Sequence, residues 1–298
     1  MWKHSGPKKV RLTGTCPERS LSSVSPDDFI QPKSIRTPRR QALEDLIRAL
    51  AMADAAVGVL QLLVQQRVTP TMTWNPFIFI PDIRFWIRSA RSDAQLQNLR
   101  RKHDNARSLD LLYEDRKDPW GLNSPDFRYQ QIKYGTMLSL LPSRRYKRAL
   151  DLGCGLGDLT RRLCDYADYV LGIDVSSVAI AQARRQTTEQ GNLQFQQGDA
   201  LNLSRELDNS FDLVVIADTL YYLSPLSDEV LQTVRERVVG LLVPGGILLL
   251  VNHFTVNFDP GSRWSRKIHR VFRSAREFKT VHESYRPFYL SSVFEKSL

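Results

Sequence analysis

Five short apolar runs, separated by longer amphipathic stretches, fill the second half of the chain and limit the folds available to it. The runs span Ala149–Leu152, Tyr169–Ile173, Leu193–Gln197, Phe211–Ala217 and Gly246–Val251. Amphipathic stretches of helix length, such as Val178–Gln190 and Ser227–Leu242, lie between them. Strands that alternate with helices predict a parallel sheet covered by helices on both faces.

Two further strand-like runs, Phe278–Tyr285 and Tyr289–Glu295, come after these five. Only Arg286–Phe288 separates them, which is too short for a parallel crossover, so we expect an antiparallel hairpin. The predicted fold class is therefore α/β: a doubly wound, mostly parallel, seven-stranded sheet with a terminal antiparallel hairpin.

The N-terminal part of the chain has a different character. Residues 1–40 carry nine basic and three acidic side chains among many prolines and serines, which predicts a disordered basic leader. Apolar residues then recur every three or four positions through residues 41–68, which predicts a helix that packs on its neighbours or self-associates. A polar helix is expected over Ser92–Tyr113. We accordingly divide the chain into a leader (1–40), a helical extension of unknown role (41–108) and a main domain (109–298).

Composition indicates the class of protein and the cellular compartment. The hydrophobic share of 42% and the charged share of 25% are typical of globular proteins. The three cysteines, Cys16, Cys154 and Cys164, show no zinc-binding spacing and cannot all pair, which favours a reducing compartment and no metal site. No apolar run is long enough to predict a transmembrane segment, and the first residues lack the apolar core of a secretory signal. We expect a cytoplasmic protein.

A glycine-rich loop follows the first predicted strand, in the sequence Asp151-Leu152-Gly153-Cys154-Gly155-Leu156-Gly157-Asp158. Glycines at alternate positions allow a sharp turn and let a ligand approach the backbone. The dinucleotide fingerprint requires glycine at position 158, where this chain has aspartate. Carboxylates on both sides of the loop would repel a pyrophosphate and suit a cation. The loop therefore predicts a positively charged cofactor without phosphate.

Acidic residues also follow the next three predicted strands. Asp174 ends the second strand, Asp199 follows the third and Asp218 follows the fourth. Doubly wound sheets bind ligands at the carboxyl ends of their strands, and an acid after the second strand commonly accepts hydrogen bonds from ribose hydroxyls. We therefore expect these three carboxylates at one sheet edge, with Asp199 next to an adenine amino group.

Together these motifs resemble those of class I S-adenosylmethionine-dependent methyltransferases, which have a Rossmann-like fold. The similarity covers about residues 109–298. Within that superfamily the chain looks most like NodS-type enzymes, which methylate the free amino group of a de-N-acetylated chitooligosaccharide. The segments that carry this likeness are Leu109–Tyr113, Asp118-Pro119-Trp120, Tyr129 to Tyr134 and Tyr221-Tyr222-Leu223.

The resemblance implies S-adenosyl-L-methionine as cofactor and assigns roles to residues of this chain. Gly153, Gly155 and Gly157 would shape the loop around the methionine part, with Asp151 near its ammonium. Further cofactor contacts would come from Asp174 at the ribose, Asp199 and Ala200 at the adenine, and Trp120 and Lys133 covering the cofactor and pairing its carboxylate. Core packing for Trp120 and a solvated position for Lys133 remain open.

Methyl transfer requires a nucleophile held in line with an activated methyl group, and an amine must be neutral to react. Asp218, Tyr221 and His253 are the candidate catalytic residues because they follow the fourth and fifth strands. Asp218 is the first choice to orient or deprotonate an amine. The expected reaction is N-methylation of an amino sugar, an oligosaccharide or another small molecule.

Three alternatives stay open to different degrees. The basic ends of the chain, including Arg263–Lys279, are compatible with an RNA methyltransferase, whose binding would weaken with salt. A base-amino DNA methyltransferase is disfavoured because Thr219-Leu220-Tyr221 replaces its Pro-Pro-aromatic element. A non-catalytic adaptor that only senses cofactor is disfavoured because the loop and its acidic residues are intact.

Overall fold

The structure is a computed structural model, and it describes residues 83–298 apart from 123, 125–126, 188–190, 255–259 and 287. All described residues belong to one compact unit. The predicted leader (1–40), the predicted helix at 41–68 and most of the extension 41–108 lie outside the described residues. Within the part that is described, no helix combines the length and the apolar content needed to cross a bilayer.

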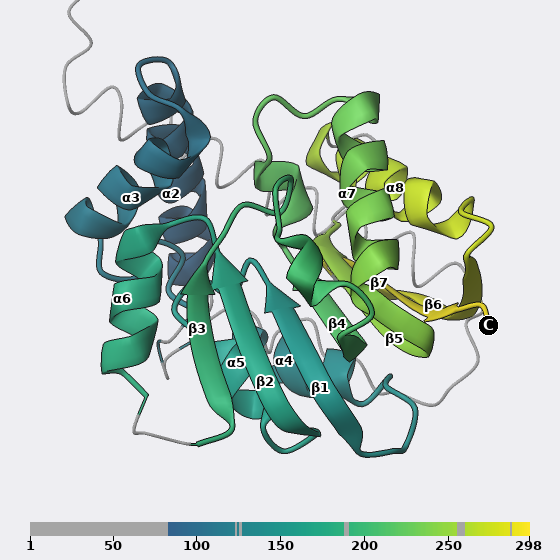
Figure 1. The fold of residues 1–298 in the computed structure, drawn as a ribbon. Helices are drawn as coiled ribbons and strands as arrows, with labels where there is room; N and C mark the ends of the chain where they lie inside the picture. The colour runs from purple at the N-terminus through teal and green to yellow at the C-terminus, as the bar shows by residue number, and fades with distance from the viewer. Residues whose placement is uncertain (1–82, 123, 125–126, 188–190, 255–259, 287) are drawn as a thin grey trace, which may run out of the picture. The chain divides into compact units, whose positions relative to one another are not determined.

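A seven-stranded sheet forms the centre of the described unit (Figure 1), with strand order β3-β2-β1-β4-β5-β7-β6. The strands are β1 (Tyr146–Leu152), β2 (Ala167–Asp174), β3 (Leu193–Gln197), β4 (Phe211–Ala217), β5 (Leu242–His253), β6 (Phe278–Arg286) and β7 (Tyr289–Lys296). β1 to β5 run parallel, whereas β7 is antiparallel to both β5 and β6. The predicted doubly wound sheet and its antiparallel hairpin are confirmed.

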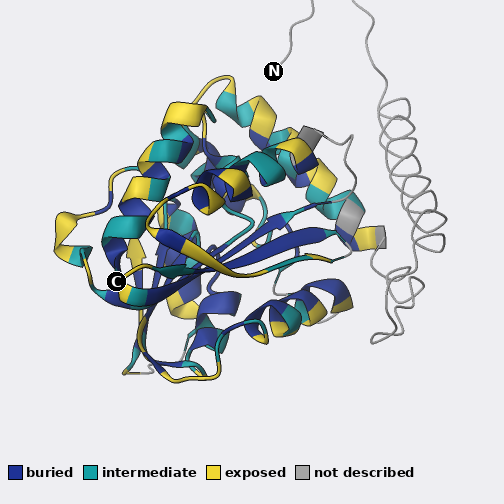
Figure 2. Cartoon of the chain, turned by 90° about the vertical axis from the view of Figure 1, so that its right-hand side faces the viewer, coloured by how far each residue is buried: buried dark blue, intermediate teal, exposed yellow. Residues whose placement is uncertain are grey.

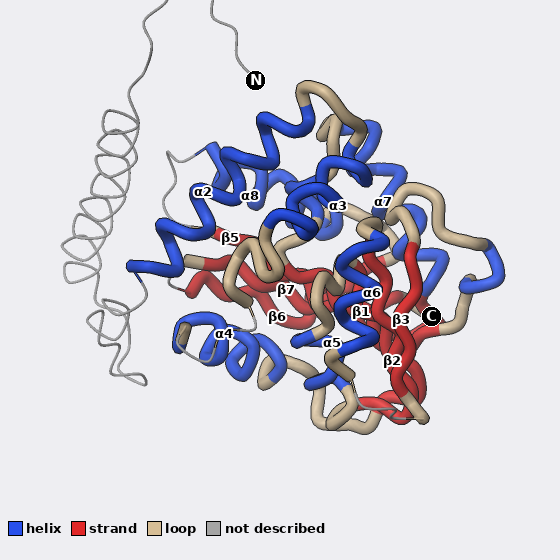
Figure 3. Tube along the Cα trace, turned by 90° about the vertical axis from the view of Figure 1, so that its left-hand side faces the viewer, coloured by secondary structure: helices blue, strands red, loops and turns tan. Residues whose placement is uncertain are grey.

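Helices cover both faces of this sheet. They are α2 (Ile83–Arg100), α3 (Asn105–Asp115), α4 (Arg128–Leu138), α5 (Asp158–Leu163), α6 (Ser177–Arg185), α7 (Asp228–Leu241) and α8 (Pro260–Arg273), with short 3₁₀ turns η2 (Arg205–Leu207) and η3 (Leu220–Tyr222). Apolar side chains of α4, α5 and α6 pack in one core cluster, and those of α7 and α8 pack in a second. Figure 3 shows the sheet between these helices. The sheet is therefore enclosed on two sides, as expected for parallel strands.

The central strands are apolar because both of their faces are covered. In β4, Leu213, Val214, Val215 and Ile216 are all fully buried, and Figure 2 shows this sheet interior in dark blue. Successive side chains of a strand point to opposite faces. Leu213 and Val215 accordingly belong to the first core cluster, and Val214 and Ile216 to the second.

The structure has two helices where the sequence predicted one continuous helix. The polar helix expected over Ser92–Tyr113 is two helices, because α2 ends at Arg100 and α3 begins at Asn105. Asp104 causes the restart: its side chain accepts a hydrogen bond of 2.8 Å from the Arg107 backbone N–H, as an N-cap does. The break turns α3 back along α2, and the two helices pack against each other.

Candidate functional site

The glycine-rich loop joins β1 to α5 and has the backbone conformation that its sequence predicted. Gly153, Gly155 and Gly157 have φ angles of 84°, 53° and 78°, in the left-handed region that favours glycine. A Cβ atom on Gly153 would lie 2.2 Å from the Thr219 side chain, and one on Gly157 would lie 2.5 Å from the Phe195 ring. The loop therefore tolerates no side chain at either position.

Asp174 lies at the end of β2 and is bonded to this loop. Its carboxylate accepts the backbone N–H of Gly155 at 2.8 Å and that of Ser176 at 2.9 Å. Burial raises its pKa, and these backbone hydrogen bonds act in the opposite direction. A carboxylate has about four acceptor positions, so Asp174 retains capacity for further donors.

Asp151 is more deeply placed than the sequence suggested. The residue is 2% exposed, and its carboxylate accepts a hydrogen bond of 2.7 Å from the Thr160 hydroxyl. Burial raises the pKa of Asp151 to about 7, and the negative charges of Asp174 and Asp158 contribute. A cation placed near this carboxyl group would favour its ionised form.

Asp199 and Ala200 follow β3 beside Asp174. The backbone N–H of Gly198 donates to the Asp174 carbonyl at 2.9 Å, which fixes the two strand ends next to each other. The Asp199 side chain is exposed and caps the Leu201 N–H at 2.9 Å. Ala200 is buried in the second core cluster. The structure thus brings Asp151, Asp174 and Asp199 to the carboxyl ends of three adjacent strands, β1, β2 and β3.

Asp218 follows β4 and forms an ion pair with Lys133 of α4. Lys133 is 3% exposed, and its ammonium also lies 5.5 Å from the centre of the Tyr289 ring. Asp218 itself adopts a φ of 54°, where its backbone N–H donates to the Val251 carbonyl at 2.8 Å. Lys133 is therefore not on a solvated helix face, and any contact with a cofactor carboxylate would compete with this ion pair.

The other candidate catalytic residues lie nearby. Tyr221 is in η3, three residues after Asp218, and burial together with the charge of Asp218 raises its pKa well above the usual value. His253 ends β5, the strand next to β4, and is half-buried. Its backbone carbonyl accepts a hydrogen bond from Ser265 of α8. Asp218, Tyr221 and His253 thus all lie at the carboxyl ends of β4 and β5.

Trp120 belongs to a group of rings beside the glycine loop, which we call the aromatic cluster: Tyr113, Trp120, Tyr221 and Tyr222. The Trp120 ring centre lies 5.8 Å from that of Tyr113 and 5.2 Å from that of Tyr222, and Tyr221 and Tyr222 are 4.6 Å apart. The Tyr113 hydroxyl would be 3.1 Å from a Cβ atom on Gly155. Trp120 is 9% exposed, so it both packs in the core and borders the site.

Sequence reasoning missed Asp93 and Arg100 of α2. The Asp93 carboxylate accepts hydrogen bonds from the Trp120 indole at 2.9 Å and the Tyr222 hydroxyl at 2.8 Å. The Arg100 guanidinium donates to the Tyr222 carbonyl. The available signal was that Asp93 is the one acidic residue in the helix sequence Ile83–Arg100, which contains four arginines.

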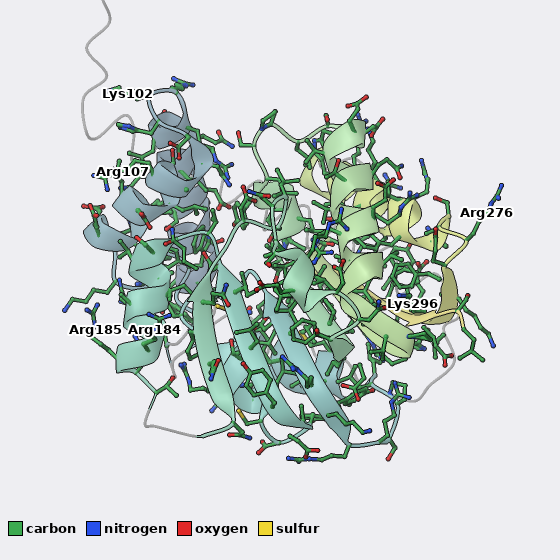
Figure 4. All side chains as sticks on the ribbon, viewed as in Figure 1. Lys102, Arg107, Arg184, Arg185, Arg276 and Lys296 are labelled. Carbon is green, nitrogen blue, oxygen red and sulfur yellow. The ribbon has the colours of Figure 1, made fainter. Side chains whose placement is uncertain are left out.

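Basic side chains occur on several elements of the described unit. Figure 4 shows Lys102 at the turn between α2 and α3, Arg107 on α3, Arg184 and Arg185 on α6, and Arg276 on the opposite side. In the predicted basic segment Arg263–Lys279, Lys267 pairs with Asp228 and Arg273 pairs with Glu283. The described residues also contain no group of three or more His, Cys, Asp or Glu side chains able to hold a metal ion.

A sequence profile for the family described as "Methyltransferase domain" matches residues 149–246, from β1 into the beginning of β5. Residues 149–246 are therefore similar to a methyltransferase domain. The glycine loop, Asp174, Asp199 and Asp218 all lie within the matched residues. Asp93, Trp120 and Lys133 lie outside them.

Known relatives resemble this methyltransferase domain over part of their length. Nodulation protein S of Sinorhizobium fredii is 30% identical over 142 residues, which are 47% of this chain and 63% of that protein. Trans-aconitate 2-methyltransferase of Deinococcus radiodurans is 35% identical over 145 residues, or 48% of this chain and 49% of that protein. The chain thus matches less than two thirds of each relative.

A solved structure has the same fold. The N-methyltransferase NodS from Bradyrhizobium japonicum WM9, in complex with S-adenosyl-L-homocysteine, superposes with a TM-score of 0.55 at 24% identity. The superposition covers 65% of this chain and 99% of that one. The Rossmann-like methyltransferase fold implied by the sequence is therefore confirmed.

Proposed function

We propose that this protein transfers a methyl group from S-adenosylmethionine to an amino group of a small-molecule or saccharide acceptor. The observation that carries the proposal is the row of carboxylates at one sheet edge, with Asp151, Asp174 and Asp199 at the ends of β1, β2 and β3 and Asp218 after β4, the strand next to β1. Carboxylates of this kind favour a cationic cofactor and an acceptor that carries an amine. The likeness to a protein named as an N-methyltransferase also supports nitrogen as the acceptor atom.

The residues of the first three strand ends fit the cofactor. Gly153, Gly155 and Gly157 present backbone without side chains, and we assign them to the methionine part with Asp151 near the ammonium. Asp174 has acceptor capacity left for ribose hydroxyls. Asp199 is exposed beside it, where it and Ala200 are proposed to hold the adenine. Trp120 would cover the cofactor from the aromatic cluster.

The residues after β4 and β5 are assigned to the acceptor. When bound, the cofactor supplies an activated methyl group on a sulfonium, so the protein has mainly to align the amine. Asp218 accepts an N–H of the amine and takes its proton, while Lys133 fixes the position of the carboxylate. Tyr221 and His253 border the same place and are proposed to exclude water and orient the acceptor.

Asp218→Asn tests this assignment. We expect label transfer from S-adenosylmethionine to a glucosamine oligosaccharide to fall by about 100-fold, as is usual when a general base is lost. Affinity for S-adenosylhomocysteine, measured by calorimetry, should stay within about threefold because Asp218 is outside the glycine loop. Asp228→Asn, which removes an exposed carboxylate paired with Lys267, is the matched control.

Two outcomes would contradict the proposal. Binding of NADH rather than S-adenosylmethionine would exclude S-adenosylmethionine as the cofactor. Full transfer activity in the Asp218→Asn variant would exclude the catalytic role of Asp218.

We also propose that the functional unit begins before residue 109. Asp93 and Arg100 contact Trp120 and Tyr222, so α2 is packed into the domain.

The two described cysteines, Cys154 and Cys164, are free thiols, in agreement with the reducing, cytoplasmic setting that we propose.

A further inference from the structure

A single carboxylate of α2 fixes two rings of the aromatic cluster. The Oδ1 atom of Asp93 accepts both the Trp120 Nε1–H and the Tyr222 O–H. Trp120 comes from the segment before α4 and Tyr222 from η3 after β4, 102 residues apart in number but 5.2 Å apart between ring centres. Asp93 therefore joins two distant segments at the carboxyl edge of the sheet.

Arg100 makes a second contact with η3, through the backbone of that turn. The Arg100 guanidinium donates to the Tyr222 carbonyl and to the Asn105 side chain. Helix α2 thus contacts both the side chain and the main chain of Tyr222. Since η3 follows Asp218 by two residues, α2 also sets the position of the segment that carries Asp218.

Asp93 and Asp218 also interact electrostatically. Burial raises the pKa of Asp93, and the negative charge of Asp218 raises it further, while Arg100 opposes this. A cation beside both carboxylates would relieve their repulsion and be attracted by each. Both hydrogen bonds to Asp93 end on Oδ1, and none from the residues that the structure describes ends on Oδ2.

We propose that Asp93 is a specificity-determining residue that selects acceptors carrying an ammonium group. Its Oδ2 accepts a hydrogen bond from the acceptor ammonium, while Oδ1 keeps Trp120 and Tyr222 in place. This inference rests on the proposed transfer to an amine and names the charge state that the site recognises. An N-acetylated acceptor carries no charge at that nitrogen, and Asp93 therefore discriminates against it.

The test uses the full chain saturated with S-adenosylhomocysteine, titrated by calorimetry with the glucosamine dimer and with its N-acetylated form. The wild type should bind the amine form at least tenfold more tightly. Asp93→Asn keeps an oxygen that can accept from Trp120 and Tyr222 but loses the charge. In this variant, we expect the preference for the amine form to disappear while the affinity for S-adenosylhomocysteine and the melting temperature are retained.

Two further variants separate charge from positioning. Asp93→Ala removes both hydrogen bonds and should also disturb Trp120 fluorescence, which Asp93→Asn should leave unchanged. Asp115→Asn is the matched control, because among the described residues this exposed carboxylate of α3 contacts only the side chains of Gln95 in α2 and of the adjacent Arg116. It should leave the preference for the amine form unchanged.

Each remaining outcome would overturn the inference. If Asp93→Asn retains the preference for the amine form, Asp93 is a structural residue only. The same conclusion follows if the variant loses affinity for S-adenosylhomocysteine by as large a factor as it loses affinity for the amine form. In both cases the proposed function stands if the wild type still methylates the dimer. If the wild type binds S-adenosylhomocysteine but neither binds nor methylates the glucosamine dimer, transfer to an amino sugar fails, and the inference fails with it.

Discussion

The two sides of the sheet edge are built in different ways. At the ends of β1, β2 and β3, which we call the glycine side, the carboxylates of Asp151, Asp174 and Asp199 bond to nearby parts of the chain, as in the hydrogen bond from Gly155 to Asp174, 19 residues away. At the ends of β4 and β5, which we call the β4 side, the partners come from far along the chain. Lys133 is 85 residues from Asp218, and Asp93 is 129 residues from Tyr222. A compact motif therefore specifies the first side, and tertiary packing specifies the second.

The largest effect is expected on the glycine side from Gly157→Ala. The new Cβ would overlap the Phe195 ring at 2.5 Å, and the residue would keep a left-handed φ of 78°. Strain and overlap together should lower the free energy of unfolding by about 3 kcal/mol. Chemical denaturation measures this loss, and S-adenosylhomocysteine binding should weaken with it.

Gly135→Ala is the matched control. Gly135 lies within α4, and a Cβ there meets no atom within 4 Å. Alanine should stabilise this helix by up to about 1 kcal/mol. Equal destabilisation by both substitutions would show that the glycine loop is no more constrained than an ordinary helix.

A smaller effect, on stability at low pH, should come from α8, the helix that packs against η3 and β5 beside the β4 side. His269 of α8 is fully buried, its Nδ1 lies 2.7 Å from the Ser292 hydroxyl, and burial lowers its pKa to about 3. Because the unfolded state binds a proton near pH 6.5 and the folded state does not, stability is retained above that pH and is lost as the pH falls toward 3. The loss should reach about 2 kcal/mol at pH 5.

Denaturation curves at pH 8 and pH 5 measure this loss. His269→Gln should abolish the contribution, whereas His282→Gln, at an exposed position on β6, should leave it unchanged. The same pH dependence in wild type and His269→Gln would assign the acid sensitivity to other groups.

The smallest effect concerns Asp151, whose pKa is shifted upward by folding, whereas that of His269 is shifted downward. Its folded pKa of about 7 lies above the unfolded value, so in the free protein its contribution to stability is greatest at low pH and declines as the pH rises through 7. If the cofactor ammonium pairs with the ionised form, S-adenosylhomocysteine should bind about tenfold more weakly at pH 6 than at pH 8. Calorimetry at both pH values tests this, and Asp151→Asn should remove the dependence. Equal wild-type affinities would place the ammonium elsewhere.

The same contrast explains what the sequence could predict. Alternating apolar runs and the spacing of Asp151, Asp174, Asp199 and Asp218 were sufficient for the sheet and its carboxyl edge, because strand period and loop motifs are local. The Lys133–Asp218 ion pair and the hydrogen bonds of Asp93 could not be predicted. They depend on how α2 and α4 pack on the sheet, and a lone acid in a polar helix carries no periodic signal. Asp104 was a visible N-cap that would have corrected the helix over Ser92–Tyr113.

The position of β7 has a consequence for biosynthesis. β6 is made first but pairs only with β7, which lies between it and β5. A nascent chain that has completed β6 therefore still presents the backbone N–H and C=O groups along one edge of β5 without a neighbouring strand. Open edges of this kind promote aggregation. Chaperone protection would matter most in the interval before Tyr289–Lys296 emerges.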